Sequence, residues 1–228
     1  MGWDPWEPYH YEGVNGEVQG LDIELVSAMA EGAGCELEFE RGEWSQLLQF
    51  LQDGRIDLLA GATMVEERES YARFSNPYRT ETFTLHVGAD AVLQGNDLNA
   101  LLDNGFRLGL TEGYIYGPQI TVLQDNPLMA TRIIYAPIAE YHFNNLKDGR
   151  IDGFLEDPYV AEATARRHGW TNLTRELPLR FGGEEVRLMF SRETVDEAVV
   201  ERMNRALAEM RSDGSHTEIL QQYQHQGP

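Results

Sequence analysis

Arg68 and Asp157 are the charged residues whose positions point most directly to ligand chemistry. Arg68 follows an apolar run at residues 56–60 that is typical of a buried strand, and the small residues Gly61 and Thr63 lie between them. Ligands of helix-covered sheets gather at the carboxyl ends of strands, so this region is suited to hold a small anion. A second apolar run ends two residues before Asp157. An arginine and a carboxylate facing each other across a cleft would suit a zwitterion.

Two other interpretations of these charged residues stay open. Arg68 follows two glutamates at an expected helix start, where a solvated charge or a surface ion pair is common. Its place just past a strand end, with Thr63 alongside, favours binding. The adjacent acids Glu156 and Asp157 suggest acid–base chemistry, but neighbours on a strand point to opposite faces, so we expect no catalytic dyad.

Motifs for metals, nucleotides and covalent catalysis are absent from the sequence. It has no CxxC, GxSxG, P-loop or GxGxxG motif, and its single cysteine excludes an internal disulfide. The histidines are scattered, and no two have a metal-ligand spacing such as HxxxH. We therefore expect no catalytic residue, no metal and no cofactor. The histidines are His10, His86, His142, His168, His216 and His225.

The composition bounds the class of protein. The chain has 228 residues, of which 42% are hydrophobic, so one large domain or two small lobes can be built. A net charge of −20 argues against binding to nucleic acid or to an anionic membrane surface. No run of 18 apolar residues exists, so we expect no membrane insertion. No signal peptide is present, and we expect that Met1 and Gly2 replace an export signal that has been removed.

A repeated segment indicates two lobes of similar plan. Residues 51–57 read LQDGRID and residues 146–152 read LKDGRID, so six of seven positions are identical. Each copy links an expected helix to an expected strand. The other interpretation is that a favourable helix-to-strand turn occurs twice by chance.

Hydrophobic periodicity predicts alternating helices and strands, which is typical of an α/β fold with parallel pairing. One predicted helix runs from Trp44 to a capping glycine at Gly54. The other predicted helices are 21–31, 98–103, 138–147, 158–168, 195–211 and 219–223, and the predicted strands are 35–40, 56–60, 80–87, 106–110, 133–135, 151–155 and 185–190.

Two loops carry candidate binding groups. The N-terminal segment is rich in aromatic residues and prolines, which disfavour a helix, and core packing and ligand contact are equal interpretations for Trp6. Further along, Gly113 and Gly117 bracket Tyr114 after an expected strand. A strand that runs into a glycine turn and a helix start can offer backbone N–H groups to an anion.

The order of motifs resembles a known family. GLDIEL, WSQLL, DGRID, TMVEER, FSNPY and GRIDGFLED occur in sequence, and the whole chain looks like the polar-amino-acid-binding proteins of ABC importers, bacterial solute-binding protein family 3. The resemblance implies an α/β, two-lobed periplasmic-binding-protein (type II) flytrap fold with two crossover strands. Lobe one would comprise residues 1–85 and 188–228, and lobe two residues 86–187.

The resemblance also implies which residues bind the ligand in the cleft between the lobes. An arginine grips the α-carboxylate beside a hydroxyl and a backbone group, and a carboxylate of lobe two takes the α-ammonium group. Two aromatic residues sandwich the ligand side chain, and a lobe-two loop closes over the carboxylate. The matching residues, in that order, are Arg68, Thr63, Gly61, Asp157, Trp6, Trp44, Gly113 and Tyr114.

Three departures from the family pattern affect the expected pocket. Val65 stands where a threonine is usual, and Tyr114 and Ile115 replace small hydroxyl residues. The usual first strand before the N-terminal aromatic residues is expected to be absent. Trp3 lies where some members have an aspartate that reads basic side chains, which favours a neutral or aromatic amino acid as ligand.

The resulting hypothesis is a monomeric periplasmic receptor that binds a small L-amino acid and delivers it to an ABC permease without performing chemistry. One alternative is an enzyme that resembles cyclohexadienyl dehydratases of the same fold, with Glu112 or Glu156 as proton donor. A second alternative is the ligand-sensing module of a membrane receptor such as a histidine kinase.

Overall fold

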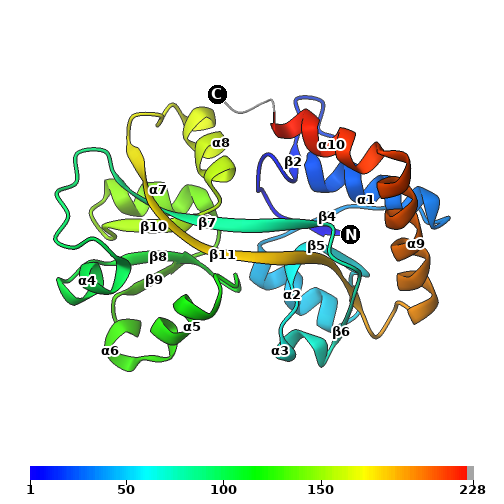
Figure 1. Cartoon of the computed structure of the whole chain (residues 1–228), viewed down its shortest axis with the longest axis horizontal. Helices are drawn as coiled ribbons and strands as arrows, with labels where there is room; N and C mark the ends of the chain where they lie inside the picture. Colours follow the sequence, from blue (N-terminus) through cyan, green and yellow to red (C-terminus); the bar gives the residue numbers. More distant parts are fainter. Residues whose placement is uncertain (225–228) are drawn as a thin grey trace. The chain divides into compact units, whose positions relative to one another are not determined.

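The computed structural model describes residues 1–224 of the chain. The chain divides into two compact units, one made of Met1–Thr80 together with the chain from Glu185 on, and one made of Glu81–Glu184. It passes from one unit to the other in β7 (Arg79–Gly88) and returns in β11 (Thr174–Ser191) (Figure 1). The expectation of an α/β fold with two crossover strands is therefore confirmed.

Unit 1 is built on strands that pair with the C-terminal half of β11. Both β5 and β6 lie antiparallel to it, β1 pairs with β4 in parallel, and β2 with β3 forms a hairpin. The strands are β1 (Gly2–Trp3), β2 (Tyr11–Glu12), β3 (Val18–Gln19), β4 (Glu40–Arg41), β5 (Leu58–Thr63) and β6 (Ala72–Phe74), and the helices are α1 (Leu21–Gly32), α2 (Trp44–Gln52), α3 (Glu66–Glu69), α9 (Glu197–Asp213) and α10 (Ser215–Gln224).

The helix pair α1 and α9 supplies much of the unit 1 core. In Figure 1 the blue α1 lies beside the orange α9 and the red α10. Apolar residues at helical spacing face this contact, and Leu25 and Met29 of α1 and Leu207 of α9 are almost fully buried. Each such side chain contributes about 1.5–3 kcal/mol. Gly32 allows a close approach, because a Cβ atom there would lie 2.9 Å from that of Ala206.

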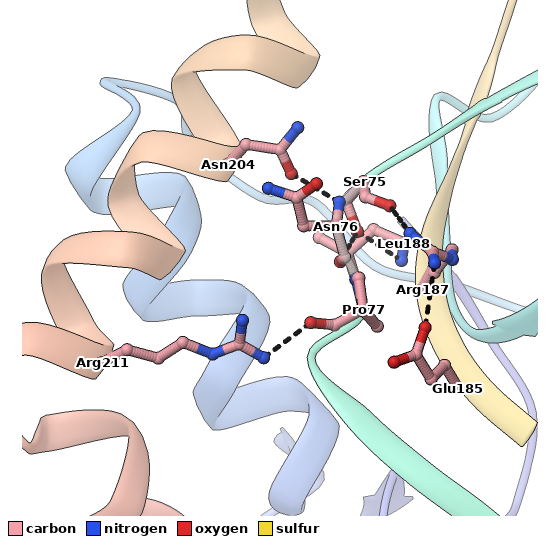
Figure 2. Close-up of polar contacts among 8 residues, drawn as sticks. All are labelled: Ser75, Asn76, Pro77, Glu185, Arg187, Leu188, Asn204 and Arg211. Atoms are coloured by element: carbon pink, nitrogen blue, oxygen red, sulfur yellow. Dashed lines mark hydrogen bonds and ion pairs between the residues drawn. The ribbon is translucent and has the colours of Figure 1, made fainter.

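The segment between β6 and β7 is fastened to β11 and α9, as Figure 2 shows. Its backbone and side chains exchange hydrogen bonds with both elements, so the start of β7 is held where the chain leaves unit 1. The Ser75 N–H donates to the Leu188 carbonyl (3.0 Å), the Leu188 N–H to Ser75 Oγ (2.9 Å), the Asn76 N–H to Asn204 Oδ1 (2.7 Å) and Arg211 Nη2 to the Pro77 carbonyl (2.6 Å).

Unit 2 contains a mixed sheet. Parallel strands follow the order β10-β8-β9, and β7 pairs with β10 in antiparallel fashion. Helices between parallel strands make the crossovers that such pairing requires. The remaining strands are β8 (Leu108–Thr111), β9 (Ile133–Ala136) and β10 (Gly153–Glu156), and the helices are α4 (Leu98–Asp103), α5 (Pro118–Asp125), α6 (Pro127–Ala130), α7 (Ala139–Lys147) and α8 (Pro158–His168).

Two sequence predictions about strands are wrong. Residues 35–40 alternate like a strand, but only Glu40 joins one, together with Arg41 in β4. The partner of β4 is β1, so a first strand does exist, formed by Gly2 and Trp3. Since β1 supplies only two residues of pairing, the alternating segment before Glu40 forms no ladder, although the Met1 amine donates to the Glu38 carbonyl at 2.7 Å.

Other strand boundaries are shifted. The predicted strand 56–60 runs instead from Leu58 to Thr63, and β11 begins at Thr174, well before the predicted 185–190. Backbone pairing with neighbouring strands carries both segments through residues whose composition does not favour a strand. By contrast, the predicted helices 98–103 and 158–168 match α4 and α8, because both have clear caps.

Unit 2 buries two histidines beside Phe154. The rings of His86 and His142 each stack on Phe154, with centroids 5.4 and 5.3 Å away. Nε2 of His142 lies 3.0 Å from the Thr111 hydroxyl oxygen. Burial lowers the pKa of His86 to about 4 and that of His142 to about 3, so both rings are neutral at pH 7.

We expect the free energy of unfolding to fall as the pH drops below about 6.5 towards 3–4. Unfolded histidines take up protons in that window, whereas His86 and His142 stay neutral in the folded state until their lower pKa values are reached. Each contributes a slope of up to about 1.4 kcal/mol per pH unit. In the His142→Gln variant the slope should be shallower, as measured by urea unfolding between pH 7 and 4.

A surface residue that does not titrate supplies the control. Gln119→Asn changes an exposed side chain of the same unit and should leave the slope unchanged. The same slope in His142→Gln as in the parent protein would contradict the assignment.

Candidate functional site

Arg68 is buried, not solvated as the alternative interpretation required. Its side chain comes from α3, directly after β5, and the residue is only 5% exposed. Nη1 donates to the Thr63 carbonyl at 2.9 Å, and the guanidinium carbon lies 5.7 Å from the Trp44 ring centroid. Thr63 and Trp44 are also buried. Unit 1 thus brings together three of the predicted site residues.

Gly61 lies at an irregularity of β5. Arg187 pairs with Ala62 and Met189 with Leu59, so two residues of β5 oppose Leu188 alone. This is the geometry of a β-bulge, and Gly61 adopts a φ of +68° within it. The Gly61 N–H donates to the Tyr78 hydroxyl at 2.8 Å. A ligand contact at the Gly61 backbone would therefore use its carbonyl oxygen.

A buried ion pair lies against Gly61. Arg79, the first residue of β7, donates from Nε and Nη2 to the two carboxylate oxygens of Asp22, both at 2.8 Å. Trp6 is 4% exposed, stacks on Tyr9 at 4.4 Å between centroids, and packs on the same guanidinium. Sequence reasoning missed Arg79, because its partner lies 57 residues earlier and no local pattern links them.

Asp157 caps a helix in unit 2. It follows β10 and is the N-cap residue of α8, where its Oδ1 accepts from the N–H groups of Tyr159 (2.9 Å) and Val160 (3.3 Å). The residue is 3% exposed. Its neighbour Glu156 is fully buried and accepts from the Asp157 N–H at 2.9 Å. The helix N-terminus favours a negative charge at this position.

The loop after β8 follows the expected order of strand, glycine turn and helix. The turn includes Gly113, and α5 begins at Pro118 with Gly117 as its N-cap residue, so Tyr114 lies in an irregular segment between them. Gly113 is exposed, and Tyr114 is half-buried with its ring 6.2 Å from Phe83 and 6.0 Å from Tyr116. Pro118 suits the first position of α5, because an N–H group there would have no partner within the helix and the fixed φ of proline is helical.

Metal-binding groups and membrane-spanning helices are not found within residues 1–224. No cluster of three or more histidine, cysteine, aspartate or glutamate residues is arranged to hold an ion. None of the described helices has both the length and the apolar character needed to cross a bilayer. His225 lies outside the described residues.

The fold is that of periplasmic amino-acid-binding proteins. An ancestral arginine-binding protein bound to arginine superposes with a TM-score of 0.83 at 25% identity, covering 97% of this chain and 95% of that one. One bound to glutamine gives 0.81 at the same identity and coverage. An ancestral amino-acid-binding protein described as a precursor of cyclohexadienyl dehydratase gives 0.78 at 22% identity, covering 97% and 92%, a likeness of fold alone.

Sequence comparison defines the family. The family of bacterial extracellular solute-binding proteins, family 3, matches residues 1–226, and the chain belongs to it. A probable histidine-binding protein of Neisseria gonorrhoeae is 26% identical, over 95% of this chain and 78% of that protein. The ABC transporter arginine-binding protein 1 of Escherichia coli K12 is 25% identical, over 96% and 86%.

The Gly61→Ala substitution should destabilise unit 1. A Cβ atom would lie 3.2 Å from Arg79 Nη2 and 3.5 Å from Asp22 Oδ2, and the left-handed backbone alone costs about 1–2 kcal/mol for a non-glycine residue. Gly34→Ala is the matched control, because Gly34 has a φ of +70° with no atom within 4 Å. Thermal unfolding should show a larger loss for Gly61→Ala; equal losses would contradict packing of Gly61 against the ion pair.

Proposed function

We propose that this protein is a monomeric periplasmic receptor that binds a neutral L-amino acid and delivers it to an ABC permease. The observation that carries the proposal is the buried, oriented guanidinium of Arg68 beside the end of β5. Membership of the solute-binding family supports the receptor role. The protein acts by binding and release and performs no chemistry.

Arg68 is proposed to hold the ligand α-carboxylate. A guanidinium presents a planar fork that matches a carboxylate, and its charge is retained when it is buried. The Thr63 carbonyl orients this fork at 2.9 Å, and the Thr63 hydroxyl is proposed to donate to the same carboxylate. In this proposal the carbonyl of Gly61 accepts from the α-ammonium group, the backbone around Gly113 completes the contacts to the carboxylate, and Tyr114 covers them.

Asp157 is proposed to take the α-ammonium group. Its carboxylate is buried and fixed by the first turn of α8, so it presents a negative charge in a defined orientation. A preorganised charge binds an ammonium group more strongly than a mobile one, because little side-chain entropy is lost. The faces of Trp6 and Trp44 are proposed to cover the aliphatic stem of the ligand.

A neutral ligand side chain is favoured by the residues of the N-terminal segment. Trp3 is buried in β1, in the place where some family members have an acidic reader of basic side chains. Some relatives are named for binding arginine or histidine, whereas an ancestral structure holds glutamine. Because Trp3 stands in place of that acid, a neutral ligand side chain is favoured over a basic one.

A second candidate function is a dehydratase-like enzyme, and it rests on Glu156. A proton donor needs a carboxyl group shielded from water, and Glu156 is fully buried, whereas Glu112 is exposed. Prephenate therefore belongs in the same ligand screen as the twenty amino acids. Formation of an aromatic product from prephenate would favour the enzyme over the receptor.

The Arg68→Ala variant should lose binding of every amino acid that stabilises the parent protein. Two charge-assisted hydrogen bonds contribute about 3 kcal/mol or more, which corresponds to at least a hundredfold in Kd. A thermal-shift screen identifies the ligand first, since a ligand at 100 times its Kd adds about 2.7 kcal/mol of stability. Calorimetric titration of parent and variant then measures the loss.

Arg55→Ala is the control for Arg68→Ala. It removes an exposed arginine from unit 1 with the same change in net charge and should leave Kd unchanged. Retained affinity in Arg68→Ala would sink the proposed function.

The roles of Asp157 in helix capping and ligand binding can be separated. Asp157→Asn keeps an oxygen for the N–H groups of Tyr159 and Val160 but removes the charge, so stability should hold while affinity falls at least tenfold. Asp157→Ala should lose the affinity and, in addition, about 1 kcal/mol of stability. Unfolding curves and titrations measure both quantities. Unchanged affinity in Asp157→Asn would rule out an ammonium contact.

A further inference from the structure

We propose that Tyr78 is a positioning residue for the ligand α-ammonium group and that it acts through the backbone of Gly61. This inference deepens the proposed function and rests on it, because it takes the ligand α-carboxylate to be bound at Arg68 and the α-ammonium group at the Gly61 carbonyl. Tyr78 itself does not touch the ligand. It fixes the bulge in β5 that presents this carbonyl.

Gly61 is the most accessible position of β5. The other residues of this strand are all buried, whereas Gly61 is partly exposed. Because glycine has no side chain, the exposed surface belongs to its backbone. The Gly61 N–H is already donated to the Tyr78 hydroxyl at 2.8 Å. The polar group that Gly61 can offer to a ligand is therefore its carbonyl oxygen.

Leu188, the residue of β11 opposite the bulge, directs its backbone elsewhere. Its N–H donates to Ser75 Oγ at 2.9 Å, and its carbonyl accepts from the Ser75 N–H at 3.0 Å (Figure 2). Ser75 directly follows β6, which pairs with β11 as β5 does. Both backbone groups of Leu188 are thus used on the side of β6, and Leu188 gives Gly61 no hydrogen bond of a regular ladder.

Tyr78 is firmly held in the core of unit 1. It is 1% exposed, its N–H donates to the Val186 carbonyl at 3.1 Å, and its carbonyl lies 2.8 Å from Nε2 of His216. Its hydroxyl is hydrogen-bonded to the Asp22 carboxylate. Burial, and then the negative charge of Asp22, raises the pKa of Tyr78, so the phenol keeps its proton. It donates this proton to Asp22 while its oxygen accepts from Gly61, and bonds in such a chain strengthen one another.

The conformation of Gly61 needs an anchor from outside. Its φ is +68°, and glycine adopts positive and negative φ about equally well. Rotation about its N–Cα bond would change the direction of its carbonyl. The hydrogen bond to Tyr78 fixes the peptide group on the N-terminal side of that bond and so limits the rotation. Without the Tyr78 hydroxyl, the carbonyl would be free to turn, whereas the guanidinium of Arg68 would be unaffected.

The spacing along β5 fits the two charged groups of one amino acid. Two positions after Gly61, Thr63 pairs with Val186, and its carbonyl accepts from Nη1 of Arg68 at 2.9 Å. Two strand positions span about 6.6 Å. That span is within the reach of an amino acid that makes a hydrogen bond of about 2.9 Å at each end. Loss of the anchor at Tyr78 should therefore weaken the ammonium contact selectively.

The first test compares ligands with and without an ammonium group in the Tyr78→Phe variant. Each L-amino acid that the thermal-shift screen identifies is paired with its des-amino acid, as in L-leucine with isocaproate or L-phenylalanine with hydrocinnamate. Calorimetric titration, by competition for weak ligands, should show a loss of about fivefold or more for the L-amino acid and less than about twofold for the des-amino acid. Equal losses, or unchanged affinity for the L-amino acid, would overturn the proposal.

Tyr223→Phe is the matched control. It removes a phenol hydroxyl of the same unit that donates to Glu24, and it should change neither affinity by more than about twofold. A selective loss of L-amino acid affinity in this variant as well would also overturn the proposal, because the effect would not depend on the contact with Gly61.

A second test uses the unmodified protein and decides the question should Tyr78→Phe not fold, which circular dichroism reports. The Gly61 carbonyl shares a peptide group with the Ala62 N–H, so a hydrogen bond to that carbonyl shifts the nitrogen resonance of Ala62. NMR titration should show a larger Ala62 shift with the L-amino acid than with its des-amino acid. Without ligand, the Gly61 amide should exchange slowly with solvent. Equal shifts, or fast exchange at Gly61, would overturn the proposal.

The two levels of proposal fail in different ways. If no amino acid binds, or if binding survives Arg68→Ala, then the receptor function itself is wrong. If amino acids bind through Arg68 but Tyr78→Phe weakens both members of a ligand pair equally, then only the positioning role of Tyr78 is wrong.

Discussion

The buried ion pair between Asp22 and Arg79 joins the parts of unit 1 that its architecture depends on. Asp22 comes from the first turn of α1, Arg79 from the start of β7, and the bulge at Gly61 lies against both. A buried pair of this kind offsets its desolvation only when its geometry is good, and removing one partner leaves an uncompensated charge. The bidentate contact at 2.8 Å and the surrounding aromatic rings satisfy that condition.

The ion pair explains why the end of β5 and the N-terminal segment lie close together. The Tyr78 hydroxyl accepts the Gly61 N–H, so the residue before the arginine fixes the bulge from the other side. Trp6 packs against the same guanidinium. The backbone of β5 is thus shaped by side chains that arrive from distant parts of the sequence. Its final residue, Thr63, then presents its carbonyl to Arg68.

Unit 2 uses a different device to orient its proposed ligand group. Asp157 is positioned by α8, the helix that it caps. The strand before it is β10, whose Phe154 packs against a buried histidine. His86 and His142 are neutral at physiological pH, so this packing does not bury a charge. The proposed contacts to an amino acid therefore come from groups that are ordered before ligand arrives, which limits the entropy lost on binding.

The sequence by itself determined the α/β class, the family and the elements with strong local signals. The helix 158–168 is delimited by an aspartate, a proline and a glycine, so its ends follow from local chemistry. The ordered motifs identified Arg68, and a strand end beside a threonine suggested its role. Only the tertiary structure decided the bulge at Gly61, the short strand at Gly2 and Trp3, and the partner of Arg79. Each of these depends on pairing between residues far apart in the chain, and local propensity carries no information about such partners.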